Sequence, residues 1–397
     1  MPKPRPLPPK RLRAHLAAEN VPFDGSEEIR IRKPVMPQPR ALQALELSLR
    51  FAGLEHNVYV AGEPGLGRTH FVTEFLATRA RRLKAPNDLL YVNNFEEPDR
   101  PGLVSLPAGE GGRFHLALKR AVAQLRKDIP ALFEQEVYLK KRENLVKKYN
   151  TSREKLLFHM EKQASSRGFN ISIDDHGGLA LYPLIEGKVL SSDEYDNLSP
   201  EYRQEIKSRS STLMDTVLET LRHIDREENE LEKRKRSLDR QETAKVLDRY
   251  FSPLTKEFAS RGQLVEFLGR IRQDMLENLE EFMPQEHDVP GIREPFSHPD
   301  DFFVRYRTNL FVDNSQTNGA PVIVEDNPSF YNLLGSIQRE TEMGTLHTDF
   351  SLLRPGSLHR ANGGFLVVNA EQLLTNPSAW EGLLRCLRSA YIKMEDP

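Results

Sequence analysis

The sequence predicts an α/β protein whose sheet-containing part is interrupted by a long helical insertion. A glycine-rich loop at residues 62–69 lies between a predicted buried strand at 56–61 and a predicted helix at 69–83. Apolar residues recur every seven positions in the charged middle of the chain, which is typical of two long helices packed together. An apolar run at 365–368, bounded by glycines and ended by polar residues, is typical of a buried parallel strand.

The glycine-rich loop matches the phosphate-binding pattern G-x-x-x-x-G-K-[ST], except that Arg68 stands where the pattern has lysine. Gly62, Gly65 and Gly67 allow backbone N–H groups to converge on an anion, and the helix that opens at Thr69 adds its positive end. A guanidinium is wider and planar, whereas the lysine ammonium is a compact point charge, so the exchange is not conservative at a crowded phosphate site. We therefore expect a nucleotide-type fold with impaired or absent hydrolysis.

The end of the later strand has a second departure. In P-loop enzymes this strand ends in an aspartate that holds Mg²⁺, usually followed by an acid that polarises the attacking water. Here the strand ends in Asn369, which brings no negative charge to a divalent ion, and Ala370 follows. Glu371 would share a face with Asn369 if the strand continued that far, so an active NTPase using Arg68 and Glu371 is the alternative.

The middle of the chain, residues 114–284, is predicted to form a helical coiled-coil hairpin. Its first arm starts near residue 116, and its second arm carries the heptad positions Val217, Ile224, Leu231 and Leu238. Between the arms, alternating apolar and polar residues around a turn at 174–178 predict a small β-hairpin cap near 168–190. Two roles stay open for this hairpin: a solvated helical spacer, and a substrate-handling or gating element.

The composition excludes several classes of protein. The 56 Lys and Arg residues nearly balance the 58 Asp and Glu residues, which disfavours a nucleic-acid-binding scaffold, although the basic start of the chain and residues 79–84 keep it as a third hypothesis. With Cys386 as the one cysteine, no internal disulfide can form. No apolar run reaches the roughly 20 residues of a membrane span, and the proline-rich start lacks a signal-peptide core. We expect a cytoplasmic protein without membrane partners.

Several segments resemble the Lon-like proteases whose AAA+ module carries a large helical insertion between its Walker A and Walker B motifs. The resemblance rests on residues 327–328, 332–335, 348–350 and 355–367. By this resemblance the fold is a P-loop AAA+-like parallel sheet, with Walker A at 62–69 and Walker B at 365–369. The departures at Arg68 and Asn369 resemble the branch of the family regarded as ATP-independent.

The resemblance also implies a domain organisation and a function. An N-terminal arm spans residues 1–39, the AAA+-like domain has segments at 40–113 and 285–397, and the helical insertion lies between them. The whole protein would be a hexameric ring protease with a C-terminal serine–lysine peptidase domain, which this chain lacks. The expected function is a non-hydrolysing AAA+-like and coiled-coil region that captures or gates unfolded protein substrates and supports ring assembly; an active ATP-hydrolysing module is the alternative.

No catalytic residue and no metal cluster stand out. The degenerate nucleotide site would consist of the loop glycines with Arg68 and Thr69 on one side and Asn369 and Glu371 on the other. No cofactor is expected, with weak binding of ATP or ADP with Mg²⁺ as the alternative. His347 and His359 are expected to support loops by hydrogen bonding, although His359 could line a subunit interface.

Overall fold

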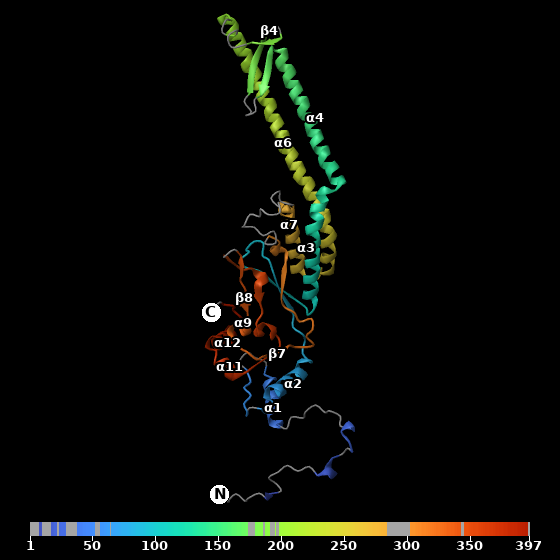
Figure 1. Ribbon diagram of the computed structural model, residues 1–397, viewed down its shortest axis with the longest axis vertical. Helices are drawn as coiled ribbons and strands as arrows, with labels where there is room; N and C mark the ends of the chain where they lie inside the picture. The colour runs from blue at the N-terminus through green and yellow to red at the C-terminus, as the bar shows by residue number, and fades with distance from the viewer. Residues whose placement is uncertain are drawn as a thin grey trace.

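The computed structural model shows an elongated molecule in which a long helical stalk rises from a base made of small sheets and short helices (Figure 1). The described residues are 8–9, 17–21, 24–28, 38–51, 56–63, 65–173, 179–185, 187–190, 195, 198–283, 302–342 and 345–395. Most of the predicted N-terminal arm, the predicted turn at 174–178 and residues 284–301 lie outside this set. The described part of the arm holds two short 3-10 turns, η2 (Ala18–Asn20) and η3 (Ser26–Glu28).

The helices of the insertion form the stalk and its root. They are α3 (Glu110–Glu134), α4 (Glu136–Ser166), α6 (Pro200–Glu257) and α7 (Gly262–Glu277), followed by the 3-10 turn η4 (Leu279–Phe282). The single first arm expected from the sequence is divided at Gln135, whose backbone is extended (φ −68°, ψ 134°). Ser199 begins α6 because its side chain accepts a hydrogen bond from the N–H of Tyr202.

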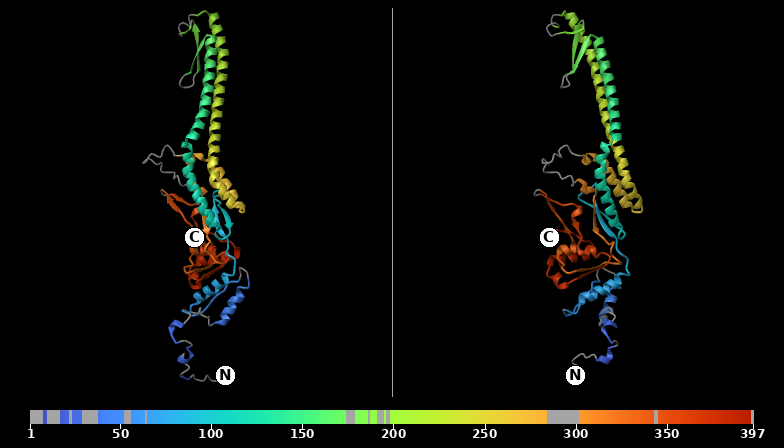
Figure 2. Two further views of the ribbon diagram at one scale, coloured as in Figure 1. Left: turned by 90° about the vertical axis from the view of Figure 1, so that its right-hand side faces the viewer. Right: turned by 45° about the vertical axis from the view of Figure 1, so that its right-hand side comes forward.

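The heptad prediction is confirmed where α4 and α6 run side by side (Figures 1 and 2). Val217, Ile224 and Leu231 are buried, and Leu238 is half-buried. Polar contacts also join the two helices: the Tyr138 hydroxyl donates to Asp239 at 2.6 Å, and Lys141 pairs with Glu242 at 2.8 Å. The stalk is therefore held by an apolar seam with hydrogen bonds along it.

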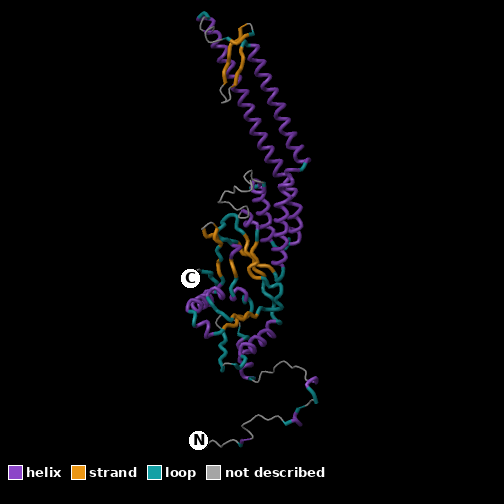
Figure 3. The backbone as a smooth tube through the Cα atoms, viewed as in Figure 1, coloured by secondary structure: helices purple, strands orange, loops and turns teal. Residues whose placement is uncertain are grey.

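A small antiparallel sheet caps the stalk (Figure 3). It contains, in the order β3-β4-β5, the strands β3 (Phe169–Ile173), β4 (Leu179–Ile185) and β5 (Lys188–Val189). Phe169 packs with Met160 and Ala164 of α4 and with Leu213 and Val217 of α6. The cap thus shares a small apolar core with the ends of both helices.

An antiparallel sheet at the root of the stalk holds the largest core. Its order is β2-β1-β6, with β1 (Asp88–Val92), β2 (Gly102–Leu106) and β6 (Thr308–Val312). Leu90, Val104 and Leu106 pack with Phe114 of α3 and Ile271 of α7 in one cluster. The strand β6 begins at Thr308, directly after the 3-10 turn η5 (Val304–Tyr306) and Arg307.

The expected parallel sheet is limited to two described strands. β7 (Val322–Glu325) pairs in parallel with β12 (Phe365–Val368), so the predicted parallel strand is confirmed, although its side chains are half-buried. Two short antiparallel pairs lie nearby, β9 (Glu340–Glu342) with β10 (Thr345–His347) and β8 (Ser336–Ile337) with β11 (Leu353–Arg354). The helical elements of the base are α1 (Pro39–Ser48), α2 (Arg68–Ala80), α9 (Phe330–Leu334), η6 (Phe350–Leu352), α10 (Ser357–Arg360), α11 (Ala370–Leu374) and α12 (Pro377–Ser389).

The predicted buried strand at 56–61 is wrong. This segment has no strand partner among the described residues, and its side chains are exposed, with Tyr59 at 79%. An apolar run forms a strand only where a neighbouring strand supplies backbone partners, and within the described ranges β12 pairs with β7 alone. The helix α2 that follows nevertheless contacts both β7 and β12.

Asp88 connects the base to the stalk through a fully buried carboxylate. One oxygen accepts hydrogen bonds from the N–H groups of Gly109 (2.8 Å) and Gly111 (2.9 Å) at the start of α3. The other accepts from the N–H of Asn314 (2.7 Å), just after β6. A Cβ on Gly111 would lie 2.8 Å from the Cβ of Asp88, so this approach requires glycine. The carboxylate of β1 thus accepts hydrogen bonds from two other segments of the chain.

Replacing Asp88 by alanine should destabilise the fold strongly. Three backbone amides would lose their acceptor in a buried place, and the expected loss is about 3 kcal/mol of unfolding free energy. Urea unfolding followed by circular dichroism measures it. Asp99→Ala, at an exposed turn position, is the matched control and should change the free energy by less than about 0.5 kcal/mol. Equal unfolding midpoints for the two variants would contradict the role given to Asp88.

Candidate functional site

The glycine-rich loop has the backbone shape of an anion-binding turn. Gly65 and Gly67 adopt left-handed conformations (φ +83° and +69°), and Gly67 is the N-cap of α2. A Cβ at either position would meet nothing within 4 Å, so their positive φ, and not crowding, favours glycine. Pro64 lies outside the described residues. The N-terminus of a helix after such a turn can hold a negative group.

Arg68 and Thr69 open α2 at the surface. The Arg68 stem lies back along the loop. Its Cδ is so near Gly62 that a Cβ placed on this glycine would lie 3.2 Å from it. The Thr69 carbonyl accepts a hydrogen bond from the Thr73 hydroxyl at 2.8 Å. Both side chains are exposed, as are Gly62, Gly65 and Gly67. Water therefore competes for any anion bound here, which weakens each contact.

Asn369 lies at the end of β12 and caps the next helix. Its side-chain oxygen accepts hydrogen bonds from the N–H groups of Glu371 (3.0 Å) and Gln372 (3.2 Å), which start α11. The alternative role of Glu371 required the strand to continue that far, and this condition is not met, because β12 ends at Val368 and Glu371 is exposed in the first helical turn. Asparagine before an acidic first turn is an N-cap signal that could have been recognised in the sequence.

A carboxylate that the sequence analysis missed lies at the same sheet edge. Glu325 ends β7 and is the register partner of Val368. Its carboxylate contacts the Ser357 hydroxyl, lies 3.7 Å from the Arg360 guanidinium and accepts a hydrogen bond from the Asn327 N–H at 3.1 Å. The buried Ser357 hydroxyl also lies 2.9 Å from the Asn332 carbonyl. Glu325 is therefore committed to holding α9 and α10 together.

The two halves of the predicted nucleotide site are not joined by polar contacts in the part of the chain that the structure describes. Among the described residues, no hydrogen bond or ion pair joins the loop at 62–69 to Asn369 or Glu371. No group of three or more His, Cys, Asp or Glu side chains in the described part of the chain could hold a metal ion. Because the amide oxygen of Asn369 is engaged with two backbone donors, these residues do not fit the Mg²⁺ site of an ATP-hydrolysing enzyme.

The segments that resemble the Lon-like proteases pack closely against one another in the base. Gly335 has a left-handed backbone (φ +85°), and a Cβ on Gly356 would lie 2.3 Å from the Leu333 carbonyl oxygen. The Asn332 side chain donates to the Asn327 carbonyl at 2.8 Å. These segments thus bring two stretches of backbone into direct contact, which explains their need for glycine.

His359 supports this junction as a neutral side chain. Its Nδ1 accepts a hydrogen bond from the Gly356 N–H at 3.2 Å, and its ring meets Phe311 edge to face at 4.8 Å. Burial lowers the pKa of His359 to about 4. The expectation of a loop-supporting histidine is therefore met at His359. His347, with an exposed side chain on β10, makes no hydrogen bond through that side chain to a described residue.

Comparison with protein families gives two matches. Residues 318–397 match a model described as the LonB-like AAA domain, and residues 88–121 match one described as the Lon-like LonC helical domain. The first covers the part of the base from just before β7 onward, and the second covers β1, β2 and the first half of α3. The two matches support a member of the Lon-like protease family, as the resemblance of the sequence implied.

The same matches place an AAA domain in a fold of mixed helices and strands. A search of curated proteins found no match to the chain. In the described residues, no helix combines the length and the apolar character needed to cross a membrane.

Acidification should destabilise the protein through His359. The unfolded histidine takes up its proton near pH 6.5, whereas the folded one resists until about pH 4. The unfolded state thus binds more protons between these values, so stability falls as the pH drops from 6.5 to 4, by up to about 3 kcal/mol. Urea unfolding at a series of pH values measures the slope.

The variant His359→Asn should flatten that slope, while His347→Asn, which removes an exposed histidine, should leave it unchanged. A wild-type slope that survives in His359→Asn would assign the pH dependence to other groups.

Proposed function

We propose that this chain is the non-hydrolysing AAA+-like and coiled-coil region of a Lon-like serine protease, which captures or gates unfolded protein chains and supports assembly of a homo-oligomeric, hexameric ring in the cytoplasm. The observation that carries the absence of hydrolysis is the engagement of Asn369. The residue at the strand end lacks a negative charge, and its one side-chain oxygen already caps α11. A Mg²⁺ ion would have to compete with that cap for a weak ligand.

The other positions of the site support the same proposal. Ala370 cannot polarise water, Glu371 points from the exposed first turn of a helix, and Glu325 is held by Ser357 and Arg360. Arg68 presents a forked guanidinium where catalysis would use an ammonium. The left-handed glycines favour residual anion binding at the loop, so weak binding of ATP or ADP without turnover is compatible with the proposal.

The apolar side chains near the cap support a substrate-handling role for the stalk. Large side chains with apolar surface are exposed on α4, β4, β5 and α6 near the cap: Phe158 (67%), Tyr182 (43%), Val189 (47%) and Tyr202 (45%). Unfolded proteins differ from folded ones by exposing apolar segments, and burial of these against exposed aromatic residues is favourable. A solvated spacer would not need aromatic residues at this end.

Calorimetry tests the part of the proposal that concerns nucleotide binding. Titration of the chain with Mg·ATP should show weak or no binding, with a Kd of about 1 mM or higher, which corresponds to a binding free energy of about −4 kcal/mol or weaker. Phosphate release should stay at the level of buffer. Arg68→Ala is the diagnostic variant, because slow ATP turnover that disappears in it would establish the alternative, an active NTPase using Arg68 as its cation.

A binding experiment with an unfolded polypeptide tests the part of the proposal that concerns substrate capture. A fluorescent, permanently unfolded polypeptide of near-zero net charge should bind the chain, and Phe158→Ser with Tyr202→Ser should weaken binding at least tenfold in fluorescence anisotropy. Val137→Ser with Leu139→Ser is the matched control, because these residues are also exposed (66% and 47%) but lie at the opposite end of α4. Equal effects of the two pairs, or no binding by the wild type, would refute a capture role for the cap.

A further inference from the structure

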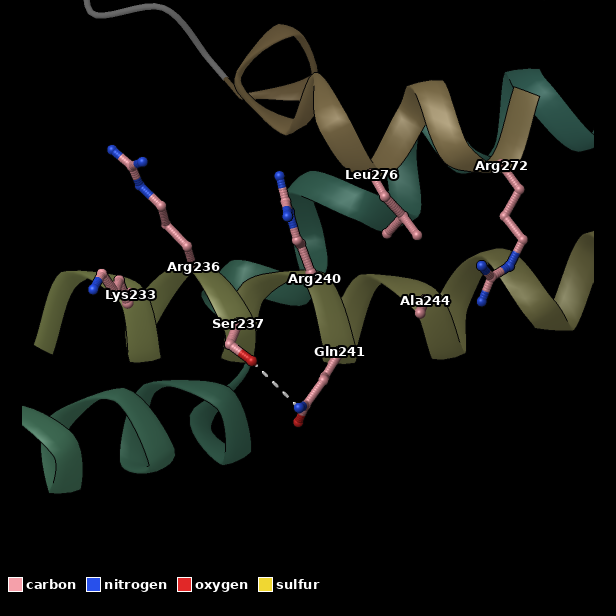
Figure 4. A pocket seen from close by; sticks show the side chains of 8 residues that line it. All are labelled: Lys233, Arg236, Ser237, Arg240, Gln241, Ala244, Arg272 and Leu276. Carbon is pink, nitrogen blue, oxygen red and sulfur yellow. Dashed lines mark hydrogen bonds between the residues drawn. The ribbon is translucent and has the colours of Figure 1, made fainter. Parts of the chain in front are cut away.

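A groove lies between α6 and α7 where the stalk meets the base (Figure 4). It has a volume of about 460 Å³, within the range of about 300–1,000 Å³ that holds a ligand or a few residues of a peptide. Its lining residues are Lys233, Arg236, Ser237, Arg240, Gln241 and Ala244 on α6 and Arg272 and Leu276 on α7. None of the apolar residues near the cap belongs to this groove.

The groove is strongly positive, and two of its four cationic side chains form no close ion pair with a described residue. Lys233 pairs with Glu230 at 2.8 Å, and Arg272 makes two hydrogen bonds to Asp248, at 2.7 and 3.3 Å. Arg236 and Arg240 make no hydrogen bond or ion pair within 4 Å to any described residue, although the pKa of Glu232 is lowered, chiefly by Lys235 and further by the charge of Arg236. No acidic residue among the described ones lines the groove. Figure 4 shows both arginines projecting from the same side of α6, on the side where α7 lies.

The spacing of these two arginines is unfavourable for the helix alone. Like charges four residues apart on a helix repel each other and cost a small amount of helix stability. An anionic group between the two guanidinium forks would remove that repulsion and gain charge-assisted hydrogen bonds. The groove therefore has the charge arrangement of an anion site, and Arg236 and Arg240 donate no hydrogen bond to another described residue.

The remaining lining distinguishes between kinds of anion. Ala244 and Leu276 add apolar surface, while the Ser237 hydroxyl and the Gln241 amide, 3.4 Å apart, add neutral hydrogen-bonding groups. A polyphosphate would use only the cations. An extended peptide has carboxylates for the arginines, backbone groups for Ser237 and Gln241, and aliphatic carbon for the apolar residues, so it uses every part of the lining.

We infer that this groove binds acidic stretches of unfolded polypeptide, with Arg236 and Arg240 holding side-chain carboxylates. The inference rests on the proposed function and specifies its substrate class: apolar segments bind near the cap, and acidic segments bind at the root of the stalk. Both sites lie on α6, which runs from one to the other (Figure 1).

The experiment measures fluorescence anisotropy of the whole chain with a labelled twelve-residue peptide that alternates glutamate with serine and leucine. Its analogue with glutamine at every glutamate position is the ligand control. Arg236→Glu with Arg240→Glu should raise the Kd for the acidic peptide at least tenfold, and the wild type should bind the glutamine analogue at least tenfold more weakly. Raising the salt concentration should weaken only the acidic peptide.

Arg222→Glu with Arg226→Glu is the matched control variant. It places the same charge change at the same four-residue spacing on exposed positions of α6 outside the groove. Its Kd should stay within twofold of that of the wild type. Where charge reversal perturbs the helix, Arg236→Gln with Arg240→Gln removes the two charges without reversing them, and its Kd is measured instead. Urea unfolding of this variant and of the wild type shows whether the fold is unchanged.

Three results would overturn the inference. The first is equal affinity of the wild type for the acidic peptide and its glutamine analogue, and the second is an equal loss of affinity in the two charge-reversed variants. The third is that no acidic peptide binds, while inorganic polyphosphate or an oligonucleotide binds the wild type and not the groove variant. The near-neutral unfolded polypeptide separates this failure from failure of the proposed function. If that polypeptide still binds through Phe158 and Tyr202, only the groove inference is wrong; if it does not, the capture role itself is wrong.

Discussion

The buried carboxylate of Asp88 is the constraint on which the arrangement of stalk and base depends. It satisfies N–H groups from the start of α3 and from the loop after β6, which is separated from Asp88 by 226 residues. Without this acceptor, three amides would be unpaired where two parts of the base meet the first helix of the insertion. The direction in which α3 leaves the sheet is fixed by this contact.

A second contact anchors the other end of the insertion at the same place. Arg261, the residue before α7, forms a two-pronged ion pair with Glu110 at the start of α3, with both distances 2.9 Å. This pairing lowers the pKa of Glu110, chiefly through the hydrogen bonds from Arg261. Because α3, the lower part of α6 and α7 share one apolar core with β1, β2 and β6, the root of the stalk and that sheet form one packed unit.

Features with local periodicity were predictable from the sequence, whereas those set by distant partners were not. The heptads of α6 and the apolar run of β12 specify their own structure, because the pattern itself creates the face that is buried. The run at 56–61 has a similar composition, but a strand also needs a neighbour that pairs with it. The antiparallel pairing of β1 with β6 joins segments more than 200 residues apart, and no pattern within either strand indicates it.

The candidate site shows the same division. The glycine loop was recognisable from its spacing, and the left-handed φ values of Gly65 and Gly67 agree with such a turn. The capping role of Asn369 was missed because the residues that follow it were not interpreted as the first turn of a helix. Glu325 was missed because its importance depends on Ser357 and Arg360, which reach it only through the folding of α9 and α10.

The length of α6 sets a geometric condition on anything that uses both ends of the stalk. On this helix of 58 residues, Tyr202 near the cap and Arg240 in the groove are separated by 38 positions, which at 1.5 Å per residue gives about 57 Å. A fully stretched polypeptide advances roughly 3.4 Å per residue, so about 17 residues are needed to cover that distance. A shorter tail could touch only one end at a time, and the stalk would then discriminate among client chains by reach as well as by chemistry.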